Sequence, residues 1–139
     1  MPQGFCTYRK ESMSHFTSIQ TQIKDIDALF SACQEMDLVL LRDGEARGFG
    51  TQKQKAAYVI QLKGPFDIAL HPENDATFRL STDWWEGHVE KEVGKHCGRL
   101  LQLYAVHKAT KEARKQGLTV LRRATRDGSI KLTIGGASL

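Results

Sequence analysis

The sequence predicts an α+β fold: one domain in which an antiparallel sheet of about six strands carries two helices on one face and ends in a β-hairpin. Two segments lead to this prediction. Residues 89–116 form a long run of helix-forming residues that stops at Gly117. Residues 118–134 then alternate apolar and polar side chains on either side of a turn sequence. Short polar connections between the earlier apolar segments favour antiparallel neighbours.

The terminal hairpin is expected to turn at Asp127 and Gly128. Asp-Gly readily supplies the positive φ angles of a type I′ turn, the commonest two-residue hairpin connection. Ile130, Leu132 and Ile134 alternate with polar residues, so one face of the last strand is expected to be buried.

The long helical segment has an apolar stripe with Leu100 and Tyr104 beside it. The stripe is made by residues at every fourth position: Val93, Cys97, Leu101 and Ala105. This spacing predicts a helix that packs on the sheet. Gly94 and Gly98 each cost about 1 kcal/mol relative to alanine inside a helix, so the helix is expected to begin after one of them.

The first half of the chain predicts a strand, a helix and further short strands. The strand covers residues 15–23, and Asp25 is expected to cap the helix that follows. The expected buried positions of that helix are Ile26, Leu29, Phe30, Cys33 and Met36. Further strands are expected at residues 38–41, 57–62, 66–70 and 76–80, with a polar connection over residues 43–51.

Length and composition predict one domain over residues 13–139, preceded by a disordered extension over residues 1–12. No signal-peptide pattern is present, and no apolar run approaches the roughly 20 residues that span a bilayer. The 3 cysteines are an odd number without a paired spacing, which suits reduced thiols. We therefore expect a cytoplasmic or plastid-stromal protein.

Several segments, taken in order, resemble one protein family. They are Met13-Ser14-His15-Phe16-Thr17, Arg47-Gly48-Phe49-Gly50, Phe66-Asp67-Ile68, Leu80-Ser81-Thr82-Asp83-Trp84-Trp85, Gln102-Leu103-Tyr104-Ala105-Val106-His107 and Asp127-Gly128-Ser129-Ile130. Over residues 13–134 they are similar to the uncharacterised family called hypothetical chloroplast open reading frame thirty-five. The resemblance implies a protein of cyanobacterial or plastid type. It implies no reaction, because the family has no established activity.

Charge is distributed unevenly along the chain. Residues 1–85 hold nine Lys and Arg against eleven Asp and Glu, a net of −2, whereas residues 86–139 hold eleven against five, a net of +6. The candidate partner-binding residues are Lys91, Lys95, Arg99, Arg122, Arg123 and Arg126. We expect an acidic macromolecule as partner, and a protein in preference to RNA, because no aromatic RNA-binding signature interleaves these residues. A merely solvated surface and an anionic membrane are the alternatives.

The sequence offers no catalytic constellation, no metal site and no cofactor motif. His88, Glu92 and His96 are spaced along about 12 Å of helix and cannot easily share one ion. We therefore expect a non-catalytic binding or assembly factor in preference to an enzyme. The alternative is a small-ligand protein or enzyme with a pocket between the long helix and the sheet, and the candidate pocket residues are Trp84, Tyr104 and His107. An RNA-binding protein is the third possibility.

Overall fold

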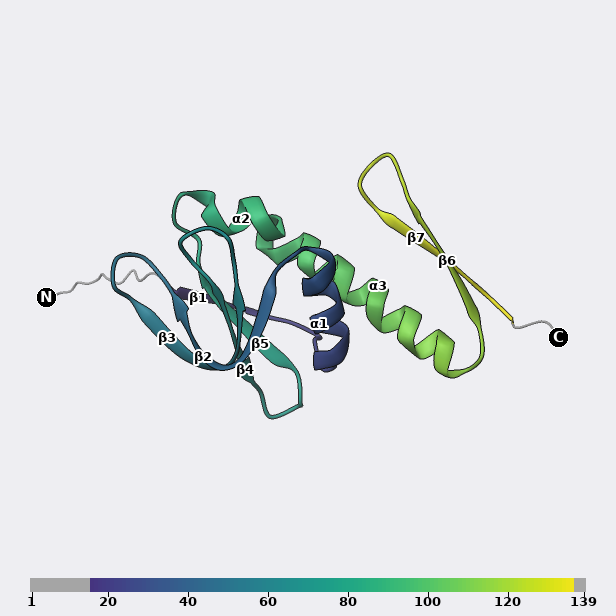
Figure 1. The fold of residues 1–139 in the computed structure, drawn as a ribbon, viewed down its shortest axis with the longest axis horizontal. Coiled ribbons are helices and arrows are strands. Elements are labelled where there is room, and N and C mark those ends of the chain that lie inside the picture. The colour runs from purple at the N-terminus through teal and green to yellow at the C-terminus, as the bar shows by residue number, and fades with distance from the viewer. Residues whose placement is uncertain (1–15, 137–139) are drawn as a thin grey trace, which may run out of the picture.

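The computed structural model describes residues 16–136 and has the predicted α+β architecture (Figure 1). The predicted extension over residues 1–12 and the expected strand residue His15 lie outside the described residues. Five strands form an antiparallel sheet in the order β1-β5-β4-β3-β2, and two more form a separate hairpin sheet, β6-β7. The strands are β1 (Phe16–Gln20), β2 (Val39–Arg47), β3 (Lys53–Gln61), β4 (Ile68–Pro72), β5 (Phe78–Asp83), β6 (Thr119–Ala124) and β7 (Ile130–Gly135).

The helices are split where the sequence predicted one long run. They are α1 (Ile26–Glu35), α2 (His88–Val93) and α3 (Gly98–Lys115), with short 3₁₀ turns at Trp85–Gly87 and Lys95–Cys97. Gly94, with φ 87° and ψ 168°, separates α2 from the second turn. The long helix therefore begins after a glycine, as expected, but residues 89–97 do not continue it.

The core lies between the five-stranded sheet and the helices. Its buried members include Leu29, Ile60, Leu80, Val89 and Leu100. Val93 and Cys97 of the predicted stripe are buried, but Ala105 is exposed because the kink rotates the buried face of α3 toward Leu103 and Tyr104.

Helix α1 is capped as predicted, but its buried face differs. Asp25 Oδ1 accepts a hydrogen bond from Ala28 N at 3.1 Å, the usual N-cap arrangement. Leu29 and Cys33 are buried as expected, whereas Phe30 is 46% exposed. The small residues Ala28 and Ala32 take the buried positions instead, because α1 packs against α3 as well as the sheet.

Strand β2 extends through the segment predicted to be a polar connection. It pairs with β3 as far as Arg47 opposite Lys53, and only a short turn remains, in which Gly48 N donates to Gln52 O at 2.8 Å. β2 is an edge strand whose side chains are mostly exposed, so its sequence lacks the apolar alternation used for prediction.

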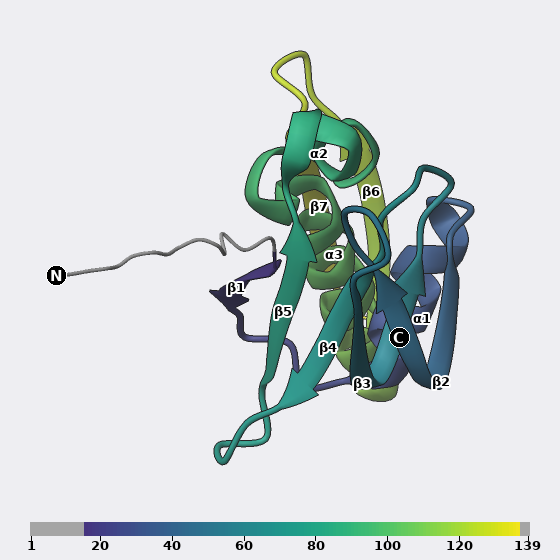
Figure 2. The ribbon, with the colours of Figure 1, turned by 90° about the vertical axis from the view of Figure 1, so that its left-hand side faces the viewer.

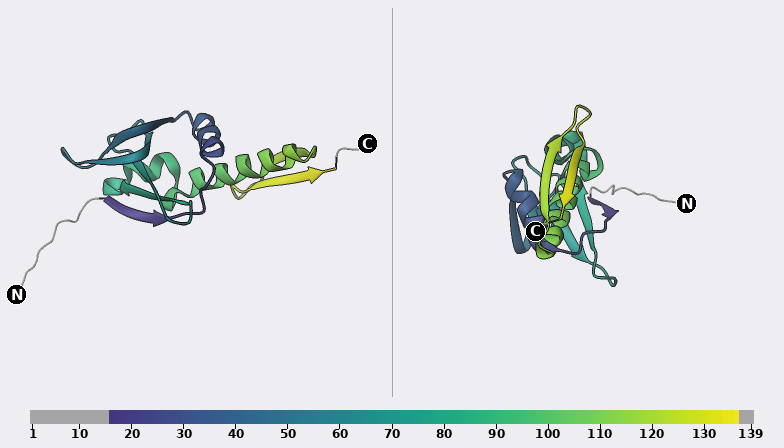
Figure 3. Two further views of the ribbon diagram at one scale, coloured as in Figure 1. Left: turned by 90° about the horizontal axis from the view of Figure 1, so that it is seen from below. Right: turned by 90° about the vertical axis from the view of Figure 1, so that its right-hand side faces the viewer.

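The β6–β7 hairpin lies along α3 and does not join the main sheet (Figures 1 and 3). Its turn is not type I′, because only Gly128 has positive φ, at 89°. Gly128 N donates to Thr125 O at 3.2 Å and Thr125 N to Ser129 O at 2.9 Å, which is a type I turn followed by a left-handed glycine. Ile130 packs against the core, but Ile134 is exposed, so the expected face is buried only in part.

Candidate functional site

A network of buried carboxylates anchors the loops at one end of the sheet. The Asp67 side chain is 2% exposed and pairs with Arg47, whose Nη2 donates to Asp67 Oδ1 at 2.7 Å and whose Nε donates to Oδ2 at 2.8 Å. The same carboxylate accepts from the backbone N–H groups of Arg47 and Leu62 at 3.0 and 3.1 Å. This hydrogen bonding raises the pKa of the Arg47 guanidinium, and both charged groups are well satisfied.

Asp83 and Glu92 extend this arrangement to neighbouring loops. Asp83 accepts from Phe49 N through Oδ2 and from Trp85 N through Oδ1, each at 2.9 Å. Glu92 accepts from the backbone N–H groups of residues 63 and 64, each at 2.8 Å. We call Arg47, Asp67, Asp83 and Glu92 the anchor network.

Three segments that carry the sequence resemblance meet at the anchor network. They are the stretches around Arg47, Asp67 and Asp83, which are far apart in sequence. Sequence reasoning quoted these segments but assigned their acidic residues no role. The signal available was an aspartate next to the end of an apolar strand segment, and it does not reveal the long-range partner.

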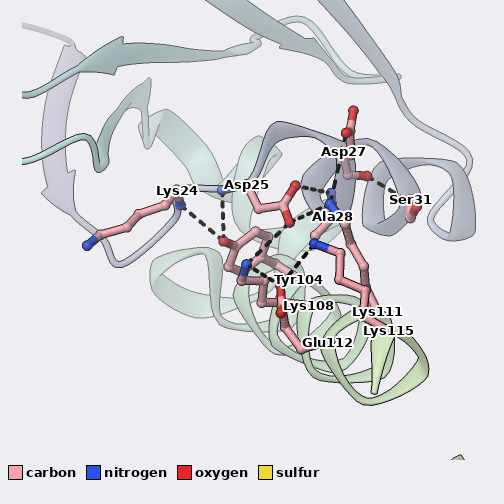
Figure 4. A network of polar contacts seen from close by, with 10 residues as sticks. All are labelled: Lys24, Asp25, Asp27, Ala28, Ser31, Tyr104, Lys108, Lys111, Glu112 and Lys115. Carbon is pink, nitrogen blue, oxygen red and sulfur yellow. Dashed lines mark hydrogen bonds and ion pairs between the residues drawn. The ribbon is translucent and has the colours of Figure 1, made fainter. Parts of the chain in front are cut away.

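A second polar network joins the start of α1 to α3 (Figure 4). Tyr104 Oη accepts hydrogen bonds from Lys24 N and Asp25 N at 3.0 and 3.1 Å. Lys111 Nζ lies 2.7 Å from Asp25 Oδ2, and Lys108 Nζ lies 3.4 Å from the same oxygen. The Lys111 hydrogen bond is the main cause that lowers the pKa of Asp25 to about 2. Tyr104 and Asp25 therefore fix how α1 sits on α3.

Replacing Asp25 with asparagine tests this network, because the amide oxygen still caps α1 but carries no charge. Ionised Asp25 stabilises the fold above its unfolded pKa, near 3.8, and this contribution is lost as the pH falls to about 2. We expect Asp25→Asn to be less stable at neutral pH by about 1–2 kcal/mol. Urea unfolding at several pH values should show that the difference in free energy of unfolding between the variant and the wild type shrinks as the pH falls from about 3.8 to about 2. A pH-independent difference would contradict the assignment.

Glu35 is the centre of a third polar cluster, at the end of α1. His107 Nε2 lies 2.8 Å from Glu35 Oε1, and Arg122 Nη1 donates to the same oxygen at 2.9 Å. The Arg122 hydrogen bond is the main cause that lowers the pKa of Glu35 to about 2. Through this carboxylate, β6 is tied to both helices.

The candidate pocket residues Trp84, Tyr104 and His107 line three separate depressions. Tyr104 lines one of about 400 Å³ beside Ile23 and Leu101, and Trp84 lines another of about 400 Å³ beside β1. His107 lines a third, of about 470 Å³, between α1 and α3. The structure therefore does not bring the three side chains into one pocket.

The residues considered for metal binding or nucleophilic chemistry are dispersed. Cys33 and Cys97 are buried, and burial raises the pKa of each thiol to about 12. His88 and His96 lie on opposite sides of the Gly94 break. Within residues 16–136, no three histidine, cysteine or acidic side chains are grouped so that they could hold one metal ion.

The structure divides the basic residues of the C-terminal half into two groups. Lys108, Lys111, Lys115 and Arg122 form ion pairs with acidic residues of the fold. In the described part of the chain, the other seven basic residues of this half are exposed and form no ion pair: Arg114, Lys131 and five of the sequence candidates, Lys91, Lys95, Arg99, Arg123 and Arg126. We call these five residues the basic surface. Arg122, the sixth candidate, is engaged by Glu35.

The hairpin turn approaches the start of α3, which places parts of the basic surface together. Gln102 Nε2 donates to Gly128 O at 3.1 Å. Arg99 lies one turn before Gln102, and Arg126 belongs to the turn itself. Figure 2 shows α2 and the hairpin turn on the same side of the molecule, and Figure 1 shows that they are apart along its long axis.

The family described as "Protein of unknown function (DUF1257)" matches residues 32–133. The chain belongs to this family. "Uncharacterized protein ycf35" of Pyropia yezoensis is 30% identical over 125 residues, covering 88% of this chain and 96% of the relative. The protein of the same name from Guillardia theta is 27% identical over 124 residues, with the same coverage of both chains. These relatives confirm the resemblance found in the sequence. No solved structure matches.

Proposed function

We propose that the protein is a non-catalytic binding or assembly factor that docks an acidic macromolecule on its basic surface. The observation that carries this proposal is that only four of the eleven basic residues in residues 86–139 are neutralised within the fold, whereas the other seven, which include the basic surface, are exposed and have no ionic partner among the described residues. Exposed positive charges attract an anionic partner and accelerate its association. A protein is the proposed partner, and RNA is the competing class.

The proposed setting is the cytoplasm of a cyanobacterial-type cell or the plastid stroma. The red-algal and cryptophyte relatives support it. No helix among residues 16–136 has the length and apolar character to pass through a membrane.

Charge reversal on the basic surface tests the proposal. The triple variant Lys91→Glu, Arg99→Glu, Arg126→Glu should fold normally, because these exposed side chains make no ion pair in the described structure. We expect it to lose at least about tenfold in partner recovery from a lysate of cells that carry the protein. Wild-type recovery should fall steeply as the salt approaches about 1 M, where the screening length is about 3 Å.

Lys55→Glu is the matched control, because Lys55 is exposed on β3 and forms no ion pair within the described residues. This variant should recover the partner as wild type does. Nuclease treatment of the lysate identifies RNA as the partner if it abolishes recovery. Equal recovery by the triple variant and the wild type would refute docking on the basic surface.

A further inference from the structure

β1 is an edge strand of the sheet. Two hollows lie between the segment that contains β1 and the helical part of the fold. β1 is the end strand of the sheet and pairs only with β5 among the described residues (Figure 2). The first hollow, of about 400 Å³, is lined by residues 17–19 on the strand side and by Trp84 and Lys95 on the helical side. The second, also of about 400 Å³, is lined by residues 20–23 and by Leu101, Tyr104 and Ala105. The two hollows are separate, but their strand-side linings are consecutive in the chain, so they follow one another along this segment, and together we call them the β1 groove.

The two hollows differ in chemistry. In the second, Tyr104 Oη accepts two backbone hydrogen bonds, and Thr21 Oγ1 donates to Phe78 O at 2.6 Å. Ile23, Leu101 and Ala105 are its apolar lining, and Gln20 and Gln22 are its other polar residues. The first hollow contains Lys95, a member of the basic surface, and a single carboxylate, that of Glu90. Lys91 and Arg99, which are exposed, lie within four residues of Lys95 in the sequence.

The helical wall of the first hollow also has unusual backbone geometry. Three of the six described non-glycine residues with positive φ lie in or next to this wall, namely Glu86, His96 and Cys97 with φ of 54°, 55° and 62°, and the other three lie elsewhere in the fold. Left-handed backbone at such residues is uncommon and is concentrated at binding and catalytic sites. Here it holds the 3₁₀ turns that present Lys95 and His96 to the groove.

We propose that the β1 groove binds an extended segment of an acidic partner protein, which adds a strand to the free edge of β1. An exposed sheet edge beside a helix supplies main-chain hydrogen bonds, and hollows along it receive alternate side chains. The segment places an apolar side chain against Ile23, Leu101 and Ala105, and a carboxylate beside Lys95. The proposal rests on the proposed function, because the partner that docks on the basic surface supplies the segment.

The test uses the full-length protein and a displayed library of random nonapeptides. We expect selection to enrich peptides that combine an acidic residue with an apolar one a few positions away. Ala105→Trp fills the second hollow from an exposed position and should weaken the selected peptides by at least about tenfold. Lys95→Glu should weaken them to a similar extent, whereas Lys55→Glu should have no effect. Ala105→Lys repeats the blocking test with a smaller, polar side chain.

Backbone methylation of the peptide separates strand addition from side-chain docking. Methylating alternate backbone nitrogens removes the donors needed for a ladder, so one of the two alternating patterns should abolish binding. Unchanged binding by both patterns would overturn strand addition. If no enriched peptide bound more weakly to Ala105→Trp than to the wild-type protein, binding in the β1 groove would be refuted. If the wild-type protein self-associated and Ala105→Trp abolished this self-association, the occupant of the β1 groove would be a second copy of this chain.

The outcomes also separate this inference from the proposed function. If partner recovery depends on Lys91, Arg99 and Arg126 but is unchanged in Ala105→Trp, docking on the basic surface is supported and binding in the β1 groove is refuted. If partner recovery is lost in Ala105→Trp and is unchanged by charge reversal, binding in the β1 groove is supported and docking on the basic surface is refuted.

Discussion

Asp67→Ala is expected to lower the free energy of unfolding by about 2–4 kcal/mol, because backbone N–H groups lose a buried acceptor and the Arg47 side chain, which is 44% exposed, loses its carboxylate partner. The carboxylate is almost fully buried and accepts four hydrogen bonds, two from the Arg47 side chain and two from backbone N–H groups. Without it, the Leu62 N–H loses its acceptor, and the Arg47 guanidinium keeps only the carbonyl oxygens of Leu62 and Gly64. Chemical denaturation at neutral pH measures the loss.

Asp37→Ala provides the comparison for a surface ion pair. Asp37 Oδ2 lies 3.3 Å from Lys63 Nζ, but its side chain is 90% exposed. Such pairs contribute about 0–1 kcal/mol, so this variant should be close to wild type. If the two aspartate variants lost similar stability, the anchor network would not hold the end of the sheet together.

Gly94→Ala is expected to destabilise the fold by about 3 kcal/mol or more, for two reasons. Gly94 has φ 87° and ψ 168°, a combination that is essentially restricted to glycine. A Cβ at this position would also lie 2.8 Å from the backbone nitrogen of Arg99, which cannot move without shifting the start of α3. Thermal or urea unfolding should therefore show a large loss.

Gly98→Ala is the matched control, because it lies at the first position of α3. Its φ of −57° is helical, and a Cβ there meets no heavy atom within 4 Å. Alanine is favoured over glycine in helices, so this variant should be as stable as wild type or more stable by up to about 1 kcal/mol. If both variants were equally tolerated, the backbone conformation at Gly94 would not be required for the fold.

These two glycines illustrate what the sequence could and could not establish. Both were expected to cost stability inside a helix, and the prediction that the helix starts after one of them is confirmed. Nothing in the local sequence distinguishes a glycine needed for a left-handed kink from one at an ordinary first helical position. The distinction depends on the packing of α2 and α3, which is a tertiary property.

The same contrast between local sequence signals and tertiary packing applies to the strands and to the polar networks. The capping residue Asp25, whose signal is local, was predicted correctly. The start of strand β2 was predicted, but its extension to Arg47 and the exposure of Phe30 were not, because an edge strand and a helix that packs against two neighbours do not follow simple apolar periodicity. The long-range partners of Asp67 and Asp83, which are Arg47 and Phe49, were missed because they lie 20 and 34 residues away in the sequence. The excess of basic residues was visible in the sequence, but only the ion pairs show which of them are neutralised.

Site-specific crosslinking tests the central claim, docking on the basic surface, most directly. A photo-reactive amino acid is placed at Lys91 in the full-length protein, and a second preparation carries it at Lys55. After irradiation in a lysate of the cells that carry the protein, the account predicts a crosslinked acidic protein from position 91 and none from position 55. No crosslink from position 91, or the same crosslinked products from both positions, would contradict it.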